Sequence, residues 1–294
     1  MASLHGSKLT DLTGRVALVT GGGTGIGNLI ARGLAANGAK VYITGRRKDV
    51  LEKAAAQAQS QGLQVIPLPL DVTDKDSIRA GVTTLKEKEG KLHILVNNAG
   101  AAGPVSMFAA NPSAPERKDT ETFGRALFEH QTFEQWKDLY QLNVASAFFV
   151  TSAFLGLLEN GAHDVGEGET SSVVNISSGL ASTHLNIGMY CYGVTKAALN
   201  HLTGSLATEY TLLKIPVRVN AIAAGYFISE ATPPELEHLV RSGLAMPGTV
   251  SPAPTKRPGK EEEMTMAVLS LVASANYING QVVTVDGGFS LVNP

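Results

Sequence analysis

The chain has 294 residues, enough for one large α/β domain or two small ones. Its 24 basic and 26 acidic residues leave a formal net charge of −2, so composition gives no reason to expect nucleic acid or a membrane as partner. The single cysteine, Cys191, excludes an internal disulfide and favours a reducing compartment. We see no apolar run of roughly 18–20 residues and no signal-peptide core near the start, and we expect a cytoplasmic protein.

Short β-branched runs alternate with longer helical patterns along the chain. Strands are expected at residues 15–20, 40–44, 63–70, 93–98, 172–177, 217–223 and 281–285. Helices are expected at residues 25–37, 49–61, 74–89, 132–158 (opened by a Thr132/Gln135 capping box), 191–213 and 261–273. This alternation requires a parallel sheet with right-handed crossovers on both faces. The sequence therefore predicts a single Rossmann-type, doubly wound α/β domain over residues 1–294, with a seven-stranded parallel sheet.

Two irregular segments interrupt the alternation, at residues 101–131 and 225–259. Both follow strands and leave the carboxyl edge of the sheet, where open α/β folds bind their ligands. We expect residues 225–259 to cover the substrate and residues 101–131 to form an insertion loop that can do the same. The alternatives are surface decoration and contact with another subunit.

A glycine-rich turn, TGGGTGIG at residues 20–27, joins the first strand to the first long helix. Its spacing, G-x-x-x-G-x-G, differs from the G-x-G-x-x-G fingerprint, but the physics is shared: the backbone can approach a pyrophosphate, and a helix N-terminus faces its charge. A turn without a ligand is the alternative. Its place between a buried strand and an amphipathic helix favours a dinucleotide site, with Gly21, Gly23, Thr24, Gly25, Ile26 and Gly27 as the contacts.

The end of the second strand indicates which dinucleotide is bound. An NAD site has an acid here for the ribose 2′-hydroxyl, whereas this chain has Arg46, Arg47 and Lys48. Bases at this position attract a 2′-phosphate, so the sequence favours NADP(H), with Arg46 as the first choice of partner and Arg47 as the second. A solvated basic loop is the alternative. Asp71 and Val72, after the third strand, are placed to flank the adenine.

Tyr192 and Lys196, in YGVTK, stand four positions apart in an expected helix, so their side chains share one face. A free tyrosine has a pKa of about 10, and a neighbouring ammonium favours the phenolate and lowers that pKa. Most such helical pairs are surface contacts. For this pair, the motifs that precede it in the chain favour a chemical role.

Taken in order, these segments resemble the short-chain dehydrogenase/reductase family from about Leu9 to Phe289. The matching motifs are TGGGTGIG (20–27), NNAG (97–100), the asparagine in LNVASAF (Asn143), NISS (175–178), YGVTK (192–196) and NGQVVTVDGG (279–288). The resemblance adds Asn98, Ala99, Gly100, Tyr192, Lys196, Gly225 and Ser229 to the expected cofactor contacts. It also implies a dimer or tetramer built on helices 132–158 and 191–213.

The resemblance assigns a role to each of four residues. Tyr192 is the general acid in carbonyl reduction and, as phenolate, the base in the reverse reaction. Ser178 hydrogen-bonds the reacting oxygen, and Lys196 holds the nicotinamide ribose and lowers the pKa of Tyr192. Asn143 positions a water through which Lys196 exchanges protons with solvent.

Three positions depart from the family pattern. Ala224-Gly225 replaces the usual Pro-Gly, and Ser229 stands where a threonine is common. The step from Ser178 to Tyr192 is one residue longer than usual, which leaves Ser177 as a second choice for the catalytic serine.

The sequence thus predicts an NADPH-dependent ketoreductase without a metal site. Its alternatives are an NAD-dependent alcohol dehydrogenase and a cofactor-binding regulator or scaffold without turnover. A fairly large, hydrophobic ketone is favoured, because the following apolar residues could line a pocket: Met107, Phe108, Leu185, Ile187, Met189, Tyr226 and Phe227. A 3-oxoacyl thioester, a quinone-like or polyketide-derived ketone and a steroid-like ketone all remain open.

Overall fold

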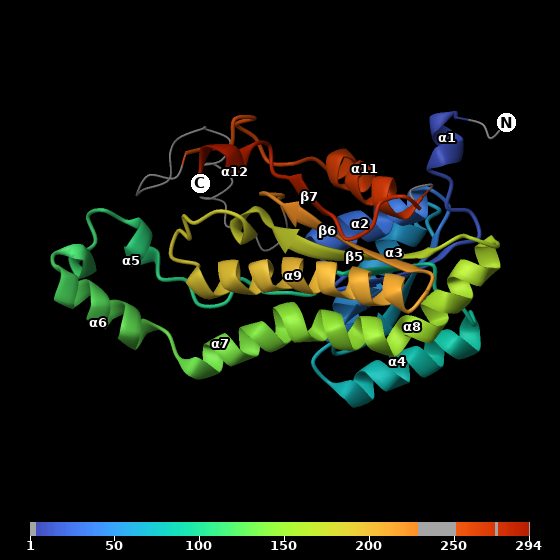
Figure 1. Ribbon diagram of the computed structural model, residues 1–294, viewed down its shortest axis with the longest axis horizontal. Coiled ribbons are helices and arrows are strands. Elements are labelled where there is room, and N and C mark those ends of the chain that lie inside the picture. The colour runs from blue at the N-terminus through green and yellow to red at the C-terminus, as the bar shows by residue number, and fades with distance from the viewer. Residues whose placement is uncertain (1–3, 229–250, 274–275, 294) are drawn as a thin grey trace.

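The structure is a computed structural model that describes residues 4–228, 251–273 and 276–293 (Figure 1). Within these residues, seven strands form one parallel sheet in the order β3-β2-β1-β4-β5-β6-β7. They are β1 (Val16–Thr20), β2 (Lys40–Gly45), β3 (Val65–Pro69), β4 (Ile94–Asn97), β5 (Ser171–Ser178), β6 (Val217–Ala224) and β7 (Val282–Val285). The strand order reverses direction at β1, as in doubly wound folds, so the predicted fold class is confirmed.

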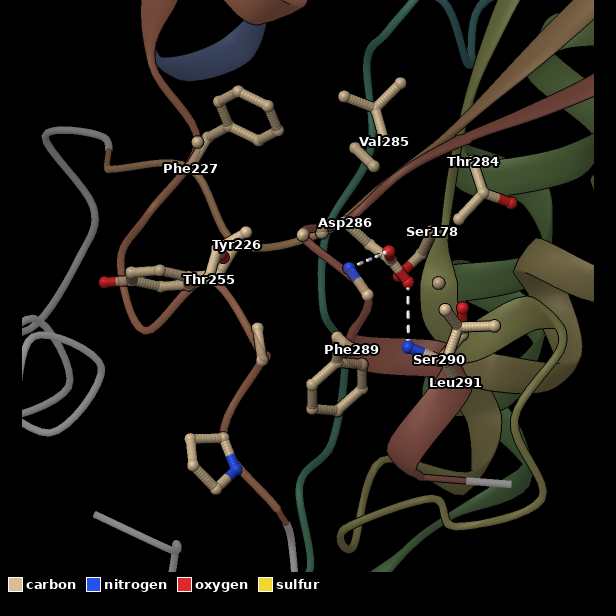
Figure 2. A pocket seen from close by; sticks show the side chains of 18 of the residues that line it. Ser178, Tyr226, Phe227, Thr255, Thr284, Val285, Asp286, Phe289, Ser290 and Leu291 are labelled. Atoms are coloured by element: carbon tan, nitrogen blue, oxygen red, sulfur yellow. Dashed lines mark hydrogen bonds between the residues drawn. The ribbon is translucent and has the colours of Figure 1, made fainter. Parts of the chain in front are cut away.

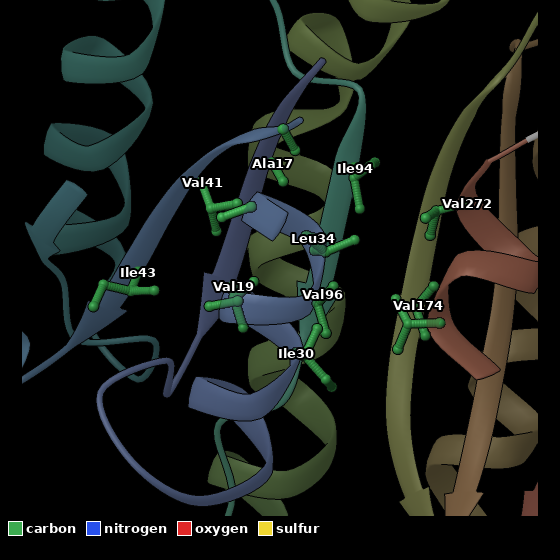
Figure 3. Packing of buried hydrophobic residues seen from close by; sticks show 14 of the residues in the cluster. Ala17, Val19, Ile30, Leu34, Val41, Ile43, Ile94, Val96, Val174 and Val272 are labelled. Carbon is green, nitrogen blue, oxygen red and sulfur yellow. The ribbon is translucent and has the colours of Figure 1, made fainter. Parts of the chain in front are cut away.

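Alternate residues of the central strands feed two apolar cores, one on each face of the sheet. Ala17 and Val19 point to one face, where α2 (Gly25–Ala36), α3 (Lys48–Gln59) and α11 (Glu261–Val272) cover the sheet (Figure 3). Val16 and Leu18 point to the other face, which is covered by α4 (Lys75–Lys88), α8 (Ser146–Val165) and α9 (Tyr190–Leu212). Because both faces are covered, every residue of β1 is buried, which explains why all of them except the terminal Thr20 are apolar.

The helix expected at residues 132–158 is divided by a π-helical turn. α7 (Phe133–Tyr140) runs into a π-turn, η2 (Gln141–Ala145), and then into α8. The predicted capping box is confirmed, with Thr132 and Gln135 each accepting a hydrogen bond from the other's backbone N–H. A π-turn inserts one residue into the helical repeat and is frequent at functional sites.

The continuous stretch Phe133–Val165 corrects the expectation that no segment approaches membrane-spanning length. It has 33 residues and a mean hydropathy of 1.5 in its most apolar window, sufficient by length and composition to cross a bilayer. Half of that window is buried inside the protein, and Val150, Phe154 and Leu158 of α8 pack on the sheet. A buried core helix meets the same length and composition criteria, so this stretch is only weak evidence for a membrane span.

The segment 101–131 is more ordered than its sequence suggests. It contains α5 (Met107–Ala110), a 3-10 turn η1 (Pro115–Arg117) and α6 (Thr120–His130), which extend beyond the body of the domain (Figure 1). Asp119 caps α6 by accepting a hydrogen bond from the backbone N–H of Thr122 at 2.7 Å. The expectation of an irregular loop was therefore wrong for much of this segment.

Three short helices complete the described chain: α1 (Gly6–Leu9), η3 (Gly179–Ala181) and α12 (Phe289–Val292). Of the predicted covering segment 225–259, residues 225–228 and 251–259 are described, and a β-bridge pairs Phe227 with Gly259. Residues 229–250, and with them Ser229, lie outside the described residues.

Candidate active site

The glycine-rich turn between β1 and α2 is folded tightly against the end of β4. Gly21 and Gly25 have positive φ values of 62° and 55°, which glycine adopts without the strain that a side chain would bring. A Cβ added at Gly27 would lie 2.4 Å from both the Asn98 amide nitrogen and the Gly21 carbonyl oxygen. Only glycine fits this position.

Asn98 and Thr20 lock the turn in place. The side-chain amide of Asn98 donates to the carbonyl oxygens of Thr20 at 2.9 Å and Gly21 at 3.1 Å. The Thr20 hydroxyl accepts hydrogen bonds from the backbone N–H groups of Asn98 and Ala99, at 2.9 and 3.0 Å. Thr20 was not predicted as a site residue, although its position at the end of a buried strand, directly before the glycines, could have indicated this role.

A cavity of about 440 Å³ opens over this turn, between α2 and the ends of β2 and β3. The expected cofactor contacts that line it are Gly21, Gly23, Thr24, Arg46, Arg47, Asp71, Val72, Ala99 and Gly100. Asp138, Gln141 and Leu142 of α7 and η2 also line it and were not predicted. Gly25, Ile26, Gly27 and Asn98 shape the turn without lining the cavity.

The residues of this cavity fit a dinucleotide. The helix α2 begins here without a side-chain cap, which leaves backbone N–H groups available to a phosphate. The Thr44 hydroxyl is buried without a hydrogen-bond partner and lines the cavity, so a bound polar ligand could satisfy it. Arg46 and Arg47 are exposed at the rim, whereas the neighbouring Lys48 forms an ion pair with Glu52.

Asp71 brings a carboxylate to the cavity just beyond the end of β3. Burial raises the pKa of this carboxyl, but two hydrogen bonds from Thr73 and the charge of Arg46 outweigh that effect, so its pKa is lower than usual. Asp71 and Arg46, 25 positions apart in the sequence, are therefore electrostatic neighbours.

Ser178 and Tyr192 meet where β5 ends and α9 begins. Their hydroxyls share a hydrogen bond that lowers the pKa of Tyr192, but burial of the phenol is the larger effect and raises that pKa overall. The alternative serine, Ser177, instead donates to the backbone carbonyl of Lys196 at 3.3 Å. Of the two serines considered, Ser178 is the one hydrogen-bonded to Tyr192.

Lys196 is buried and lies over the ring of Tyr192. Its ammonium is 5.7 Å from the ring centroid and donates a hydrogen bond to the carbonyl oxygen of Ile176 at 2.8 Å. Burial lowers the pKa of Lys196 to about 8. The expectation that Lys196 lowers the pKa of Tyr192 was wrong for this structure. Burial of the phenol raises that pKa, and the ammonium donates its hydrogen bond to a backbone carbonyl.

Asn143 lies in the π-turn η2 and is buried, and both atoms of its side-chain amide are hydrogen-bonded. Its oxygen accepts from the backbone N–H of Ala101, and its nitrogen donates to the carbonyl of Ala101 and the hydroxyl of Thr195, each at 3.0 Å. The Thr195 hydroxyl in turn donates to the carbonyl oxygen of Tyr192 at 2.8 Å. Thr195, within YGVTK, thus connects Asn143 to the helix of Tyr192 and Lys196, a link that the sequence did not reveal.

Gly100 brings these groups together with the nucleotide cavity. A Cβ at Gly100 would lie 3.0 Å from the Asn143 amide oxygen and 3.6 Å from the Lys196 ammonium, and Gly100 itself lines the cavity. Asn143 and Lys196 therefore stand directly behind the cavity wall.

A second cavity, of about 840 Å³, opens on the other side of Ser178 (Figure 2). Ile187, Met189, Tyr226 and Phe227 line it as expected, whereas Met107, Phe108 and Leu185 are not among its lining residues. Residues after β7, including Asp286, Phe289 and Leu291, and the stretch 251–257 supply the remaining wall and were not predicted. Gly225 also lines this cavity, and a Cβ there would lie 2.5 Å from the Cα of Asp286, so the sheet end requires glycine.

Comparison with known proteins places this arrangement in a family. A family model described as short chain dehydrogenase matches residues 15–239. The chain is 35% identical over 295 residues to the short-chain dehydrogenase/reductase PhomF of Diaporthe leptostromiformis, covering 99% of this chain and 97% of the relative. The protein belongs to the short-chain dehydrogenase/reductase family.

Two solved structures of this family share the fold over nearly the whole chain. The Pseudomonas aeruginosa RhlG/NADP active-site complex superimposes with a TM-score of 0.79 at 30% identity, covering 96% of this chain and 99% of that one. A 7α-hydroxysteroid dehydrogenase complexed with NADH and 7-oxo glycochenodeoxycholic acid gives a TM-score of 0.76 at 28% identity, covering 97% and 98%. As a short-chain dehydrogenase/reductase, the protein is an oxidoreductase with a nicotinamide cofactor.

Proposed function

We propose that this short-chain dehydrogenase/reductase is an NADPH-dependent ketoreductase that acts on a fairly large, hydrophobic ketone. The observation that carries the proposal is the position of Ser178, Tyr192, Lys196 and Asn143 between a basic-rimmed nucleotide cavity and a large apolar cavity. Ser178 lines the apolar cavity, and Gly100, against which Asn143 and Lys196 pack, lines the nucleotide cavity.

Each of the four side chains has a task that suits its surroundings. Tyr192 carries a proton at neutral pH, because burial keeps its pKa above the ordinary value, and can therefore donate it to a carbonyl oxygen. Ser178, already hydrogen-bonded to that phenol, orients the same oxygen and stabilises the charge it gains.

Lys196 and Asn143 act behind Tyr192. The buried ammonium of Lys196 stabilises negative charge that develops at Tyr192 when its proton leaves, and would hold the ribose of the nicotinamide. Asn143 fixes the backbone of Ala101 and the start of α9, and would position a water beside Lys196. NADPH, when bound, supplies hydride to the carbonyl carbon.

The residues proposed to hold NADP(H) follow the nucleotide cavity from one end to the other. The phosphates would lie on the glycine turn and the start of α2, with the 2′-phosphate at Arg46 and Arg47 and the adenine between Asp71 and Val72. RhlG was solved with NADP and the hydroxysteroid dehydrogenase with NADH, so relatives of similar overall fold differ in cofactor. An NAD-dependent alcohol dehydrogenase is therefore the second candidate, and the exposed arginines favour the first.

The apolar cavity supports a hydrophobic substrate. Its volume of about 840 Å³ is at the upper end of the range of roughly 300–1,000 Å³ that ligand pockets commonly have. Aromatic rings of Tyr226, Phe227 and Phe289 contribute to its lining. Polar groups such as Thr255 and Asp286 are also present, but most of the wall is apolar, so a polycyclic or long acyl ketone would fit it better than a polyol.

The direct test is a panel of ketones offered to the purified protein with NADPH or NADH, followed by loss of reduced-cofactor absorbance. We expect turnover of bulky apolar ketones with NADPH and little turnover of sugar-derived ketones. Equal rates with NADH would refute the NADP(H) preference. Tight NADPH binding without turnover of any ketone in the panel would favour a regulatory or scaffolding role.

We also propose a homodimer or homotetramer in the cytoplasm. Tyr140, Phe148, Phe149 and Val194, on α7, α8 and α9, are large apolar side chains between 38% and 53% exposed, and the rings of Phe148 and Phe149 are 5.4 Å apart. Burial of these faces against a second copy would cover them. Sedimentation of wild type and of Phe148→Glu tests the assembly, since the charged variant would dissociate it.

A further inference from the structure

The side chain of Asn293 joins α12 to the stretch that begins at Ser251. Asn293 is 1% exposed, and its amide oxygen accepts a hydrogen bond from the backbone N–H of Ser251 at 2.8 Å. Its amide nitrogen donates to the carbonyl oxygens of Ser251 and Phe289, each at 2.9 Å. One buried amide thus holds both backbone groups of Ser251 and the first residue of α12, a contact between segments 42 positions apart.

Both segments joined by Asn293 form one wall of the apolar cavity (Figure 2). Ser251, Pro252, Ala253 and Thr255 line it from one segment. Phe289, Ser290 and Leu291 line it from the other. The wall thus depends on how these two segments lie against each other.

The turn between β7 and α12 packs closely against the segment that begins at Ser251. Asp286 holds the turn by accepting hydrogen bonds from the backbone N–H groups of Gly288 and Ser290, both at 2.9 Å. Gly287 has a φ of 64°, and a Cβ there would lie 2.3 Å from the Thr255 hydroxyl. The backbone N–H of Thr255 donates to the Gly287 carbonyl at 3.3 Å, so the two segments are in direct contact at this point as well.

From this geometry we propose that Asn293 is a positioning residue for the substrate wall. Its amide fixes residues 251–256 against the β7–α12 turn, and this contact sets the shape of the apolar cavity without touching the nucleotide cavity. The kinetic part of this proposal rests on the proposed ketoreductase function. The role of Asn293 in holding residues 251–256 against the turn does not depend on that function.

The isosteric variant Asn293→Asp separates hydrogen bonding from packing. It keeps the oxygen that accepts from Ser251 but replaces the donor with an oxygen that faces two carbonyl oxygens. We expect KM for an apolar ketone to rise about tenfold, which corresponds to a loss of roughly 1.4 kcal/mol of binding. We expect kcat to stay within about twofold and NADPH affinity to be unchanged, because the reacting groups do not contact Asn293.

Hydrogen exchange supplies a measurement that does not require turnover. Backbone amides of residues 251–256 should exchange faster in Asn293→Asp than in wild type, while those of β5 should not change. Asn293→Ala removes the amide without adding a charge and should give the same pattern if the aspartate variant does not fold.

Asn276→Asp is the matched control. Asn276 also has a hydrogen-bonded amide, which accepts from Thr170 and donates to Glu169. These partners directly precede β5, so Asn276 lies at the amino-terminal ends of the strands, whereas the apolar cavity lies at their carboxyl ends. This variant should leave KM and exchange at 251–256 unchanged. Wild-type KM and exchange in both Asn293 variants would overturn the proposal, as would equal losses in kcat and NADPH affinity. A wild type that reduces no ketone would refute the proposed function alone, and the exchange result would still decide the role of Asn293.

Discussion

The ammonium of Lys196 lies 5.7 Å from the ring centroid of Tyr192, over the phenol ring that we propose as the proton donor. Its hydrogen bond goes to the carbonyl oxygen of Ile176, so the two side chains of YGVTK are neighbours without being a bonded pair. Lys196 is buried and Tyr192 is half-buried, and loss of solvation shifts the pKa of each group in favour of its neutral form. Burial thus disfavours charge on both groups, but with a pKa of about 8 Lys196 keeps its proton at pH 7, so negative charge developing at Tyr192 would be stabilised by the cation beside it.

Replacing Tyr192 by phenylalanine should abolish most turnover. Loss of a positioned general acid costs about 10²- to 10⁴-fold in rate. The fluorescence-measured affinity for NADPH should remain close to that of wild type, since the phenol ring is kept. Tyr190→Phe, in the same turn of α9, is the control and should retain activity. A Tyr192→Phe enzyme with wild-type kcat would refute the assignment.

Replacing Lys196 by methionine should stabilise the folded protein near pH 7. The unfolded chain holds the lysine proton up to the ordinary pKa of 10.5, whereas the folded protein releases it near 8. Between these values the unfolded state binds more protons, so wild-type stability should rise with pH across this window. Below it the penalty for burying the charge is fully present, on the order of 3 kcal/mol.

Urea unfolding at about pH 7 and about pH 9.5 checks this sign, in a range where tyrosines stay largely protonated. The free energy of unfolding of Lys196→Met should exceed that of wild type by more at the lower pH than at the higher one. Lys53→Met, at an exposed position of α3, should show no such pH dependence. A stability difference that is constant with pH would contradict the lowered pKa.

Arg46→Asp should shift cofactor preference toward NADH. A charge-assisted hydrogen bond contributes about 1.5–3 kcal/mol, so NADPH affinity should fall by roughly ten- to a hundredfold, while NADH binding is little affected. Lys48→Ala is the matched control, because Lys48 is paired with Glu52 and does not line the cavity. Dissociation constants of NADPH and NADH for wild type, Arg46→Asp and Lys48→Ala measure this preference. An unchanged NADPH to NADH ratio in Arg46→Asp would show that the arginine does not contact the 2′-phosphate.

The sequence predicts regular elements well and contacts between distant segments poorly. All seven strands were located, since a buried parallel strand is a short, continuous β-branched run, as in Val16–Thr20, and the more exposed β7 has the same kind of sequence. The π-turn at Asn143 was not predicted, because one additional residue in a helical repeat leaves the apolar pattern almost unchanged. The helix α6 could have been recognised from its cap, Asp119, and from Phe123, Ala126 and Leu127 at helical spacing.

The residues of the candidate site were likewise predicted where they lie within one motif and missed where they come from distant segments. Residues within one motif, such as Tyr192 and Lys196, are brought together by the helix itself. The wall formed by residues 251–257 and the β7–α12 turn depends on two segments packing across the end of the sheet. Neither segment carries a local pattern that indicates the other, so Asn293 could be found only in the structure.

The turn at Gly188 gives the final prediction, since it joins the 101–131 segment to the apolar cavity. Gly188 has a φ of 79° and follows Ile187, which lines the cavity and has a φ of 45°. Its carbonyl oxygen accepts a hydrogen bond from the backbone N–H of Ser106 at 2.8 Å, and a Cβ at Gly188 would lie 2.4 Å from the Ser106 carbonyl oxygen. Gly188→Ala must therefore push the two segments apart.

Gly168→Ala isolates this contact from backbone strain. Gly168 has nearly the same φ, 78°, but nothing within 4 Å of the added Cβ. Both alanines should lower stability by about 1 kcal/mol through the left-handed conformation alone. Only Gly188→Ala should also raise KM for the ketone, by roughly fivefold or more, because Ile187 moves with the turn. Steady-state kinetics and urea unfolding of the two variants measure both effects, and equal KM values would mean that the 101–131 segment does not influence the cavity.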